Sequence, residues 1–162
     1  MLLLMATALL TTLTLLRNYD YRSELALWRD VAEKAPHNPR GQYNYGVYLQ
    51  LADPPQYDDA IRQYRRTLEL DRNYADAHLN LGSLAAFRKE WPQAKQHYER
   101  LRELQPTNAA ALYGIAQAAE QLGDPLAARI AVERLLEVDA NHVAGKSLMA
   151  RLDEAGIATE PR

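Results

Sequence analysis

The sequence predicts an all-α protein: an α-α superhelix, or solenoid, of about three helix-pair repeats with flanking half-repeats, preceded by a hydrophobic helix. The first observation is a period of 34 residues, which relates Ala60 to Ala94 and Ala94 to Ala128. The second is that apolar residues within each period recur at helical spacing, on one face of each of two helices. A fixed period of this length indicates stacked helix pairs rather than one central core.

The composition is that of an ordinary folded domain and excludes several kinds of chemistry. The chain has 162 residues, of which 48% are hydrophobic and 25% charged, as is typical of one domain. Its net charge of −2 provides no broad positive field for nucleic acid or anionic lipid. The absence of cysteine from the chain excludes disulfides, thiolate metal sites and a cysteine nucleophile.

Residues 1–17 begin with an uncharged, mostly apolar run and are predicted to be a transmembrane segment. As a helix this run would be about 24 Å long, slightly less than a hydrocarbon core of roughly 30 Å. We therefore expect the last part of a transmembrane helix; a short uncleaved anchor, a signal sequence and a buried helix are the alternatives. Arg17, Arg22, Arg29 and Lys34 follow it and favour a cytoplasmic position for the remainder.

A half-repeat is predicted for residues 18–38 and the first full repeat for residues 39–74. The half-repeat has the apolar face of a single second helix, formed by Tyr21, Leu25, Trp28 and Val31 and ended by Pro36. The hydrophobic segment is a candidate for its missing first helix. The two helices of the full repeat have the inner faces Gln42, Tyr45, Gly46 and Leu49, then Tyr57, Ala60, Tyr64, Thr67 and Leu68.

The second full repeat is predicted for residues 75–108. Its second helix opens at Trp91-Pro92, because proline fits the first turn of a helix, where its missing N–H is not needed. Gly82 and Ala94 are small and let the two helices approach closely, while the large Tyr98 fills the space beside that contact. The expected inner faces are Ala77, His78, Leu81, Gly82 and Ala85, then Trp91, Ala94, Tyr98 and Leu101.

The third repeat is predicted for residues 109–142, a capping helix for 143–156 and a tail for 157–162. The capping helix has Asn141 as a candidate N-cap and a polar side of Arg151, Asp153 and Glu154. The inner faces of the third repeat are Leu112, Ile115, Ala116 and Ala119, then Ala128, Val132 and Leu135.

The repeat pattern resembles the tetratricopeptide repeat (TPR). The residues that carry the resemblance are Asn80-Leu81-Gly82, Ala94, Tyr98 and Pro106, with weaker copies at Asn44-Tyr45-Gly46, Ala60 and Tyr64, and at Ile115-Ala116, Ala128 and Val132. Arg72 and Ala140 depart from the family pattern, in which proline is usual, and Gly114 stands where asparagine is common. The resemblance implies a superhelix whose first helices line a concave, protein-binding face.

Residues 15–28 are similar to a junction in polytopic membrane proteins. There an apolar span is followed by Arg17-Asn18, Ser23-Glu24-Leu25 and Trp28, as in the transmembrane and TPR-containing O-mannosyltransferases. This resemblance implies that the chain is the C-terminal tail of a larger membrane glycosyltransferase-like protein. It also implies repeats on the extracytoplasmic (periplasmic or luminal) side, opposite to the local charge rule.

No catalytic or metal-binding constellation is evident in the sequence. None of His37, His78, His97 and His142 has the close spacing of a zinc-binding helix, and His78 is expected to be a packing residue. Acidic residues such as Asp153 are expected to be solvated surface. We therefore expect no enzymatic activity from this chain, no metal and no small-molecule cofactor.

Nucleic-acid binding is not expected either. Tyrosines such as Tyr45 and Tyr57 are assigned to the core, and Arg62, Arg65 and Arg66 fall on the outer face of a second helix.

The concave groove is the predicted binding surface. Asn44 and Asn80 lead this prediction, because an amide can donate to and accept from the backbone of an extended peptide. The alternative is that both asparagines bind only their own neighbouring helix. Ala110 and Gly114 occupy positions where basic residues would be expected in related repeats that bind a terminal carboxylate. We therefore predict no cluster of cations that clamps a carboxylate. The predicted groove residues are Arg40, Tyr43, Asn44, Val47, Gln50, Asp76, Leu79, Asn80, Ser83, Phe87, Tyr113, Gln117 and Gln121.

Three functions are compatible with this pattern. The leading prediction is a membrane-tethered module, anchored through residues 1–17, that binds a partner protein or extended peptide in the groove. The second is an accessory domain that presents substrate to a polytopic membrane glycosyltransferase. The third is a self-assembling scaffold.

Overall fold

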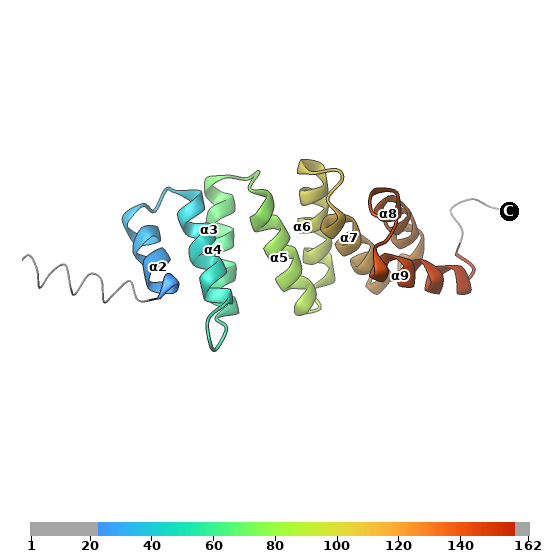
Figure 1. The fold of residues 1–162 in the computed structure, drawn as a ribbon, viewed down its shortest axis with the longest axis horizontal. Coiled ribbons are helices and arrows are strands. Elements are labelled where there is room, and N and C mark those ends of the chain that lie inside the picture. Colours follow the sequence, from blue (N-terminus) through green and yellow to red (C-terminus); the bar gives the residue numbers. More distant parts are fainter. Residues whose placement is uncertain (1–22, 158–162) are drawn as a thin grey trace, which may run out of the picture. The chain divides into compact units, whose positions relative to one another are not determined.

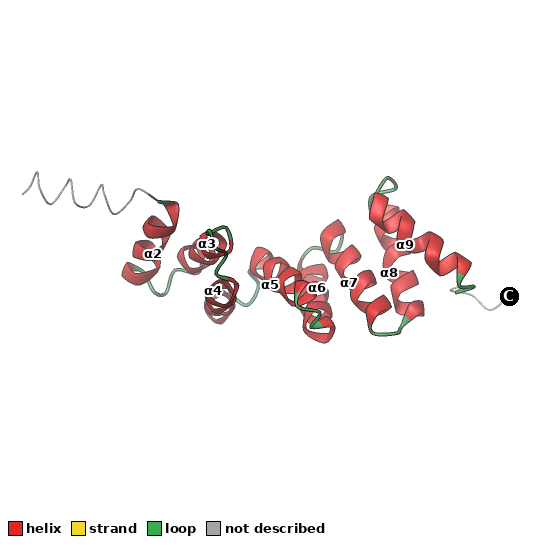
Figure 2. Cartoon of the chain, turned by 90° about the horizontal axis from the view of Figure 1, so that it is seen from below, coloured by secondary structure: helices red, strands yellow, loops and turns green. Residues whose placement is uncertain are grey.

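The computed structural model describes residues 23–157, which form helices joined by short loops (Figures 1 and 2). Within this range there is no strand, which agrees with the predicted all-α class. The chain divides into two compact units, Met1–Leu70 and Asp71–Arg162. The helices are α2 (Glu24–Lys34), α3 (Pro39–Gln50), α4 (Tyr57–Leu70), α5 (Ala75–Phe87), α6 (Trp91–Leu104), α7 (Ala109–Gln121), α8 (Pro125–Val138) and α9 (Val143–Glu154).

In the first unit, α3 and α4 pack as a helix pair and α2 packs on α3. Asn38 starts α3, since its side-chain oxygen accepts hydrogen bonds from the backbone N–H groups of Arg40 (3.1 Å) and Gly41 (3.3 Å). The ring of Tyr64 in α4 lies against Gly46 in α3, where an added Cβ would be 2.7 Å from the ring. Glycine at this position therefore permits the close approach of the two helices.

Most of the inner faces predicted for the first unit are buried. Gln42, Gly46, Leu49, Ala60, Tyr64 and Thr67 are buried, whereas Tyr45, Tyr57 and Leu68 are only half-buried. The hydroxyl of Tyr45 accepts a hydrogen bond from Nε of Arg29 (3.1 Å) in α2, so this side chain reaches the surface rather than the core.

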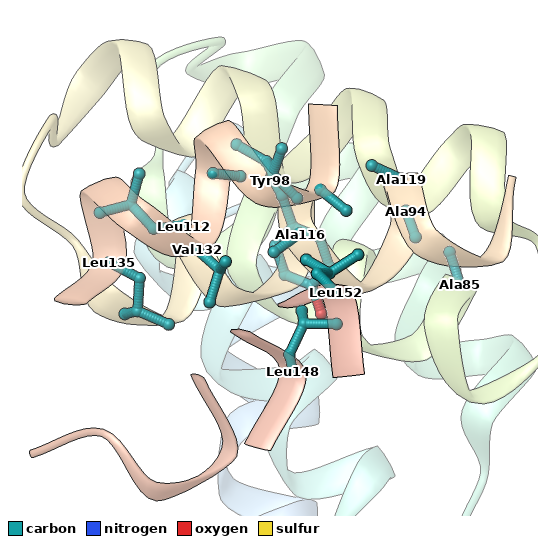
Figure 3. Packing of buried hydrophobic residues seen from close by; sticks show 13 residues of the cluster. Ala85, Ala94, Tyr98, Leu112, Ala116, Ala119, Val132, Leu135, Leu148 and Leu152 are labelled. Carbon is teal, nitrogen blue, oxygen red and sulfur yellow. The ribbon is translucent and has the colours of Figure 1, made fainter. Parts of the chain in front are cut away.

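In the second unit, α5 pairs with α6 and α7 with α8, while α6 also packs on α7 and α9 on α8. The side chains drawn in Figure 3 come from all five helices and form one continuous core. All predicted inner-face residues of α5, α7 and α8 are buried, as are Ala94, Tyr98 and Leu101 of α6; Trp91 is half-buried. The buried cluster consists of Ala85, Ala94, Tyr98, Leu112, Ile115, Ala116, Ala119, Ala128, Ala131, Val132, Leu135, Leu148 and Leu152.

Tyr98 is held between glycines of two different helices. A Cβ at Gly82 in α5 would lie 2.9 Å from Cε1 of the ring, and one at Gly114 in α7 would lie 2.5 Å from Cδ2 and Cε2. The two edges of the ring therefore face the two glycines. This contact explains why Gly114 departs from the family pattern: an asparagine side chain there would overlap the ring.

The turns follow local sequence rules, with one correction. As predicted, α6 begins at Trp91. The structure adds that Asp124 accepts a hydrogen bond from the backbone N–H of Ala127 (3.0 Å) at the start of α8. The N-cap of α9 is His142 rather than the predicted Asn141, because Nδ1 of His142 accepts the N–H of Gly145 (3.0 Å). The helix itself begins at Val143, where the sequence predicted it to begin.

The sequence predicted a solvated polar side for α9, but two of its charged residues form ion pairs with other helices. Arg151 forms an ion pair with Glu120 of α7 (2.8 Å), and Asp153 forms one with Arg129 of α8 (2.6 Å). Arg129 also donates to the carbonyl of Ile157 (2.5 Å). These bonds attach the last helix to the two helices before it.

The predicted membrane segment and most of the predicted tail lie outside the described residues. Among residues 23–157, no helix is both long enough and apolar enough to cross a bilayer.

Candidate partner-binding face

Each of the two units has a candidate face of its own, formed by side chains of its first helices that lie beside the buried stripe. In α5 and α7, which contact each other in the second unit, the stripe residues turn into the core and leave the neighbouring positions accessible. None of the thirteen predicted groove residues is buried. We call those on α5 and α7 the α5/α7 face and those on α3 the α3 face.

On the α3 face, Arg40 is exposed and the other residues are half-buried. Gln50 is already engaged, since its side-chain oxygen accepts a hydrogen bond from the hydroxyl of Tyr64 (3.0 Å). Tyr43 packs against the ring of Tyr64, with 5.7 Å between the ring centroids. Asn44 has no hydrogen-bond partner within residues 23–157, so its amide is available to a ligand.

On α5, the polar groups are largely used within the protein. The hydroxyl of Ser83 donates to the carbonyl of Leu79 (2.9 Å) and accepts from the hydroxyl of Tyr98 (3.3 Å). Asn80 is half-buried and already has an interaction partner in the protein. Phe87 is 70% exposed at the end of the helix. This part of the face offers an apolar contact more than free hydrogen-bonding groups.

On α7, Gln117 and Gln121 contribute amides and Tyr113 a ring. Gln117 is half-buried and has no hydrogen-bond partner within the described range. The ring of Tyr113 packs on that of His142, with 5.1 Å between the centroids. The asparagine that is common at this position in the family is absent from α7, where Gly114 lies against the ring of Tyr98. The next side-chain amide along α7 is that of Gln117.

The electrostatics of the α5/α7 face are close to neutral. Asp76 is the one charged residue among its predicted members, and Ala110 and Gly114 add no cation. A face without clustered cations does not hold a terminal carboxylate by charge, whereas amides and apolar groups suit a peptide backbone.

Beside this face, His78 and His97 form a pair that their spacing of 19 residues did not reveal. Their Nδ1 atoms are 3.2 Å apart, and Nε2 of His78 donates to the carbonyl of Arg72 (3.1 Å). His78 is therefore the satisfied packing residue that was expected. Burial lowers its pKa below the ordinary value of 6.5, while the bond to the Arg72 carbonyl acts in the opposite direction.

No metal-binding cluster accompanies the pair. Within residues 23–157, no group of three or more histidine, cysteine, aspartate or glutamate residues is placed to hold a metal ion.

Two family models match the chain. One is described as Tetratricopeptide repeat and matches residues 88–152, and the other as TPR repeat and matches residues 56–85. The two matched stretches together cover more than half of the chain.

Curated relatives match over a limited length. Protein O-mannosyl-transferase TMTC1 of Homo sapiens is 35% identical over 86 residues, which is 51% of this chain and 10% of the relative. The protein of the same name from Mus musculus is 34% identical over 82 residues, 51% of this chain and 8% of the relative. The chain therefore spans about a tenth of the length of these relatives, and the match covers about half of this chain.

Solved structures share the fold. A crystal structure of MamA has a TM-score of 0.74 at 20% identity and covers 82% of this chain and 77% of that chain. The TPR protein YrrB, whose structure is described as having an unusual peptide-binding site, has a TM-score of 0.71 at 18% identity, with 80% and 66% covered. The first TPR of Spaghetti (RPAP3), bound to an HSP90 peptide, has a TM-score of 0.67 at 18% identity, with 74% and 94% covered.

These likenesses establish the solenoid fold. The family-model matches run from the start of α4 into α9 with the helix pairs described above, and the chain is therefore a member of the tetratricopeptide repeat family.

Proposed function

We propose that this chain is a protein-interaction module whose first helices bind an extended segment of a partner protein. TPR proteins act in protein or peptide interactions, and two of the similar structures are described by their peptide ligand or peptide-binding site. The proposal for this chain assigns that role to the α3 face and to the α5/α7 face, each taken by itself. Residues 1–17 would tether the module to a membrane.

The observation that carries the proposal is that each face has a side-chain amide without a hydrogen-bond partner among the described residues. Asn44 and Gln117 are half-buried, and neither has a hydrogen-bond partner among the described residues. A half-buried amide next to a core is confined by its neighbours, and it loses little freedom when it binds a peptide backbone. Exposed Phe87 adds apolar area to the α5/α7 face.

The ligand that fits best is an extended peptide with mixed side chains and no requirement for a free C-terminus. The α5/α7 face lacks the clustered cations that would select a carboxylate, so recognition relies on backbone hydrogen bonds and apolar contacts. A face of this size is expected to give micromolar affinity, about −8 kcal/mol.

The test uses peptides selected from a random display library on the 162-residue chain, with affinities measured by fluorescence anisotropy. Asn44→Ala should weaken peptides that bind the α3 face, and Gln117→Ala those that bind the α5/α7 face, by roughly three- to tenfold, because each removes a hydrogen bond worth about 1 kcal/mol. Gln96→Ala is the matched control, since it removes an exposed amide from the second helix α6. Affinities that are unchanged in both face variants would refute the assignment.

A second function is favoured by the similarity to the O-mannosyltransferases. Under this proposal the repeats form the C-terminal accessory domain of a polytopic membrane glycosyltransferase and present acceptor protein to it, on the extracytoplasmic side of the membrane. The 35% identity over 86 residues supports it. An antibody against the repeats decides between the two functions: a native species near 18.4 kDa means an independent module, and a much larger membrane-bound species means a tail.

The side of the membrane can be tested on the same protein because the chain contains no cysteine. Gln121→Cys places a thiol at an exposed site of α7. A membrane-impermeant maleimide is added to intact cells and to cells in which only the plasma membrane is opened. Periplasmic repeats are labelled in intact cells, and luminal repeats only after the internal membranes are opened as well. Labelling as soon as the plasma membrane is opened would support the cytoplasmic orientation that the local arginines favour.

A further inference from the structure

A crevice opens between the second helices α6 and α8, with α7 as its floor. It has a volume of about 150 Å³, comparable with cavities of about 150 Å³ that accept one small apolar group. None of the residues of the α5/α7 face lines it. The crevice is therefore a separate feature of the second unit.

The floor and one wall of the crevice are apolar. Leu112 and Ile115 of α7 are buried beneath it, and Ala131 and Ile130 of α8 form the wall. Ile130 is 47% exposed and belongs to a stripe with Leu126 and Val138, which are 47% and 44% exposed. Residues spaced by four along a helix share one face, so exposed apolar surface continues along α8 on both sides of the crevice.

The rim of the crevice carries more cations than acids. Lys95 and Arg102 of α6 and Arg134 of α8 line it, together with one acid, Glu99. Lys95 and Glu99 lie 3.9 Å apart and largely offset each other.

The two arginines of the rim keep their charge available. Within residues 23–157, neither Arg102 nor Arg134 forms an ion pair. Two of the acids beside them pair with other arginines: Glu103 with Arg100 (2.6 Å) and Glu133 with Arg129 (3.0 Å). Two guanidinium groups that form no ion pair in this range therefore flank an apolar hollow.

We propose that this crevice is a second docking site, which binds an acidic segment of a partner protein that carries one aliphatic anchor residue. The anchor enters the hollow above Leu112 and Ile115, and carboxylates on either side of it pair with Arg102 and Arg134. Arginine suits this role because its planar group binds carboxylates in a bidentate manner.

A protein segment fits these features better than a lipid surface does. The hollow admits a single side chain, whereas attraction to an anionic lipid surface needs a cluster of several basic residues, and the rim has two arginines without ion pairs among the described residues. The site extends the function proposed above, since the partner bound by the first helices and the segment bound here contact different residues.

The test measures binding of a fluorescein-labelled acidic peptide, with one leucine between glutamates, to the 162-residue chain. Binding should weaken about threefold for Arg102→Glu or Arg134→Glu and roughly tenfold for both, and it should fall with added salt. Ile130→Asp should also weaken it. Arg65→Glu is the matched control, because it makes the same charge change at an exposed site of the second helix α4. Peptides with lysine for glutamate, or alanine for leucine, should not bind.

Three results would overturn the proposal. One is that the acidic peptide does not bind, or that Arg134→Glu and the control Arg65→Glu weaken its binding equally. Another is that the acidic peptide does not bind, whereas phosphatidylserine vesicles bind and Arg134→Glu weakens that binding. The site would then be one for a membrane surface. The third is self-association that Ile130→Asp abolishes and the peptide does not compete. Gln117→Ala should leave acidic-peptide binding unchanged, so failure of this site and failure of the α5/α7 face are distinguishable.

Discussion

Gly114→Ala tests the glycine that is most closely approached by a neighbouring side chain in the described part of the chain. The new methyl group would lie 2.5 Å from Cδ2 and Cε2 of the Tyr98 ring and 2.6 Å from Cζ. An ordinary contact needs at least about 3.4 Å, so the ring would have to move by roughly 1 Å. On its other edge the ring already lies so close to Gly82 that a Cβ there would be 2.9 Å away. The ring cannot move away from Gly114 within its own plane without approaching Gly82.

The expected loss of stability follows from two opposing terms. Alanine is a better helix former than glycine by about 1 kcal/mol in a helix interior such as that of α7. Overpacking a filled core costs about 1–3 kcal/mol, and the confinement of Tyr98 from both sides places this site toward the upper end. We therefore expect Gly114→Ala to lower the free energy of unfolding by about 1–2 kcal/mol. Gly82→Ala should cost less, because its contacts are 2.9–3.1 Å.

The assay is urea unfolding of the 162-residue chain, followed by circular dichroism. Gly41→Ala in α3 is the matched control, since the closest atom to its new methyl group would be Cγ1 of Val31, at 3.2 Å, followed by Asn38 at 3.8 Å. A small shift of the Val31 side chain relieves the contact, so the control should keep the wild-type stability or raise it by up to about 1 kcal/mol through helix propensity.

The sign should reverse when the ring is removed. In a Tyr98→Val background, which is destabilised by the lost ring, Gly114→Ala should raise stability by up to about 1 kcal/mol, because only the helix-propensity term remains. The packing argument is refuted if Gly114→Ala stabilises the wild-type chain. It is also refuted if the substitution costs the same whether residue 98 is tyrosine or valine.

Two further predictions concern side chains between helices. Because burial holds the pKa of His78 below 6.5, its neutral form is favoured in the folded state. The midpoint temperature of unfolding should therefore fall as pH drops from about 7.5 to about 5.5. His78→Gln should reduce this pH dependence, and the control His37→Gln should not. Arg129→Met should raise amide exchange in α9 several-fold in exchange mass spectrometry, because it removes the bonds to Asp153 and Ile157, and Arg65→Met should leave that exchange unchanged.

The candidate faces were predictable in part. Helical spacing located the accessible positions of α3, α5 and α7, because the same period that buries one stripe leaves its neighbours outside. It did not distinguish Asn44, which has no partner among the described residues, from Asn80, which has one. That difference depends on side chains that surround each amide in space. The crevice between α6 and α8 was not anticipated, since its residues come from three helices and share no spacing.

The sequence alone determined the helix pairs and the matching of small residues to large ones. The period places Val132 at the position of Tyr98 and Ala116 at that of Gly82. Each repeat therefore shows in its sequence a small residue on the first helix and a larger one on the second. Only the tertiary structure decided the contacts that join elements far apart in the chain: His78 with His97, Arg151 with Glu120, and Tyr98 with Gly114 of the next repeat. Periodicity describes which face of a helix is buried, whereas the partner of a side chain depends on the packing of neighbouring helices.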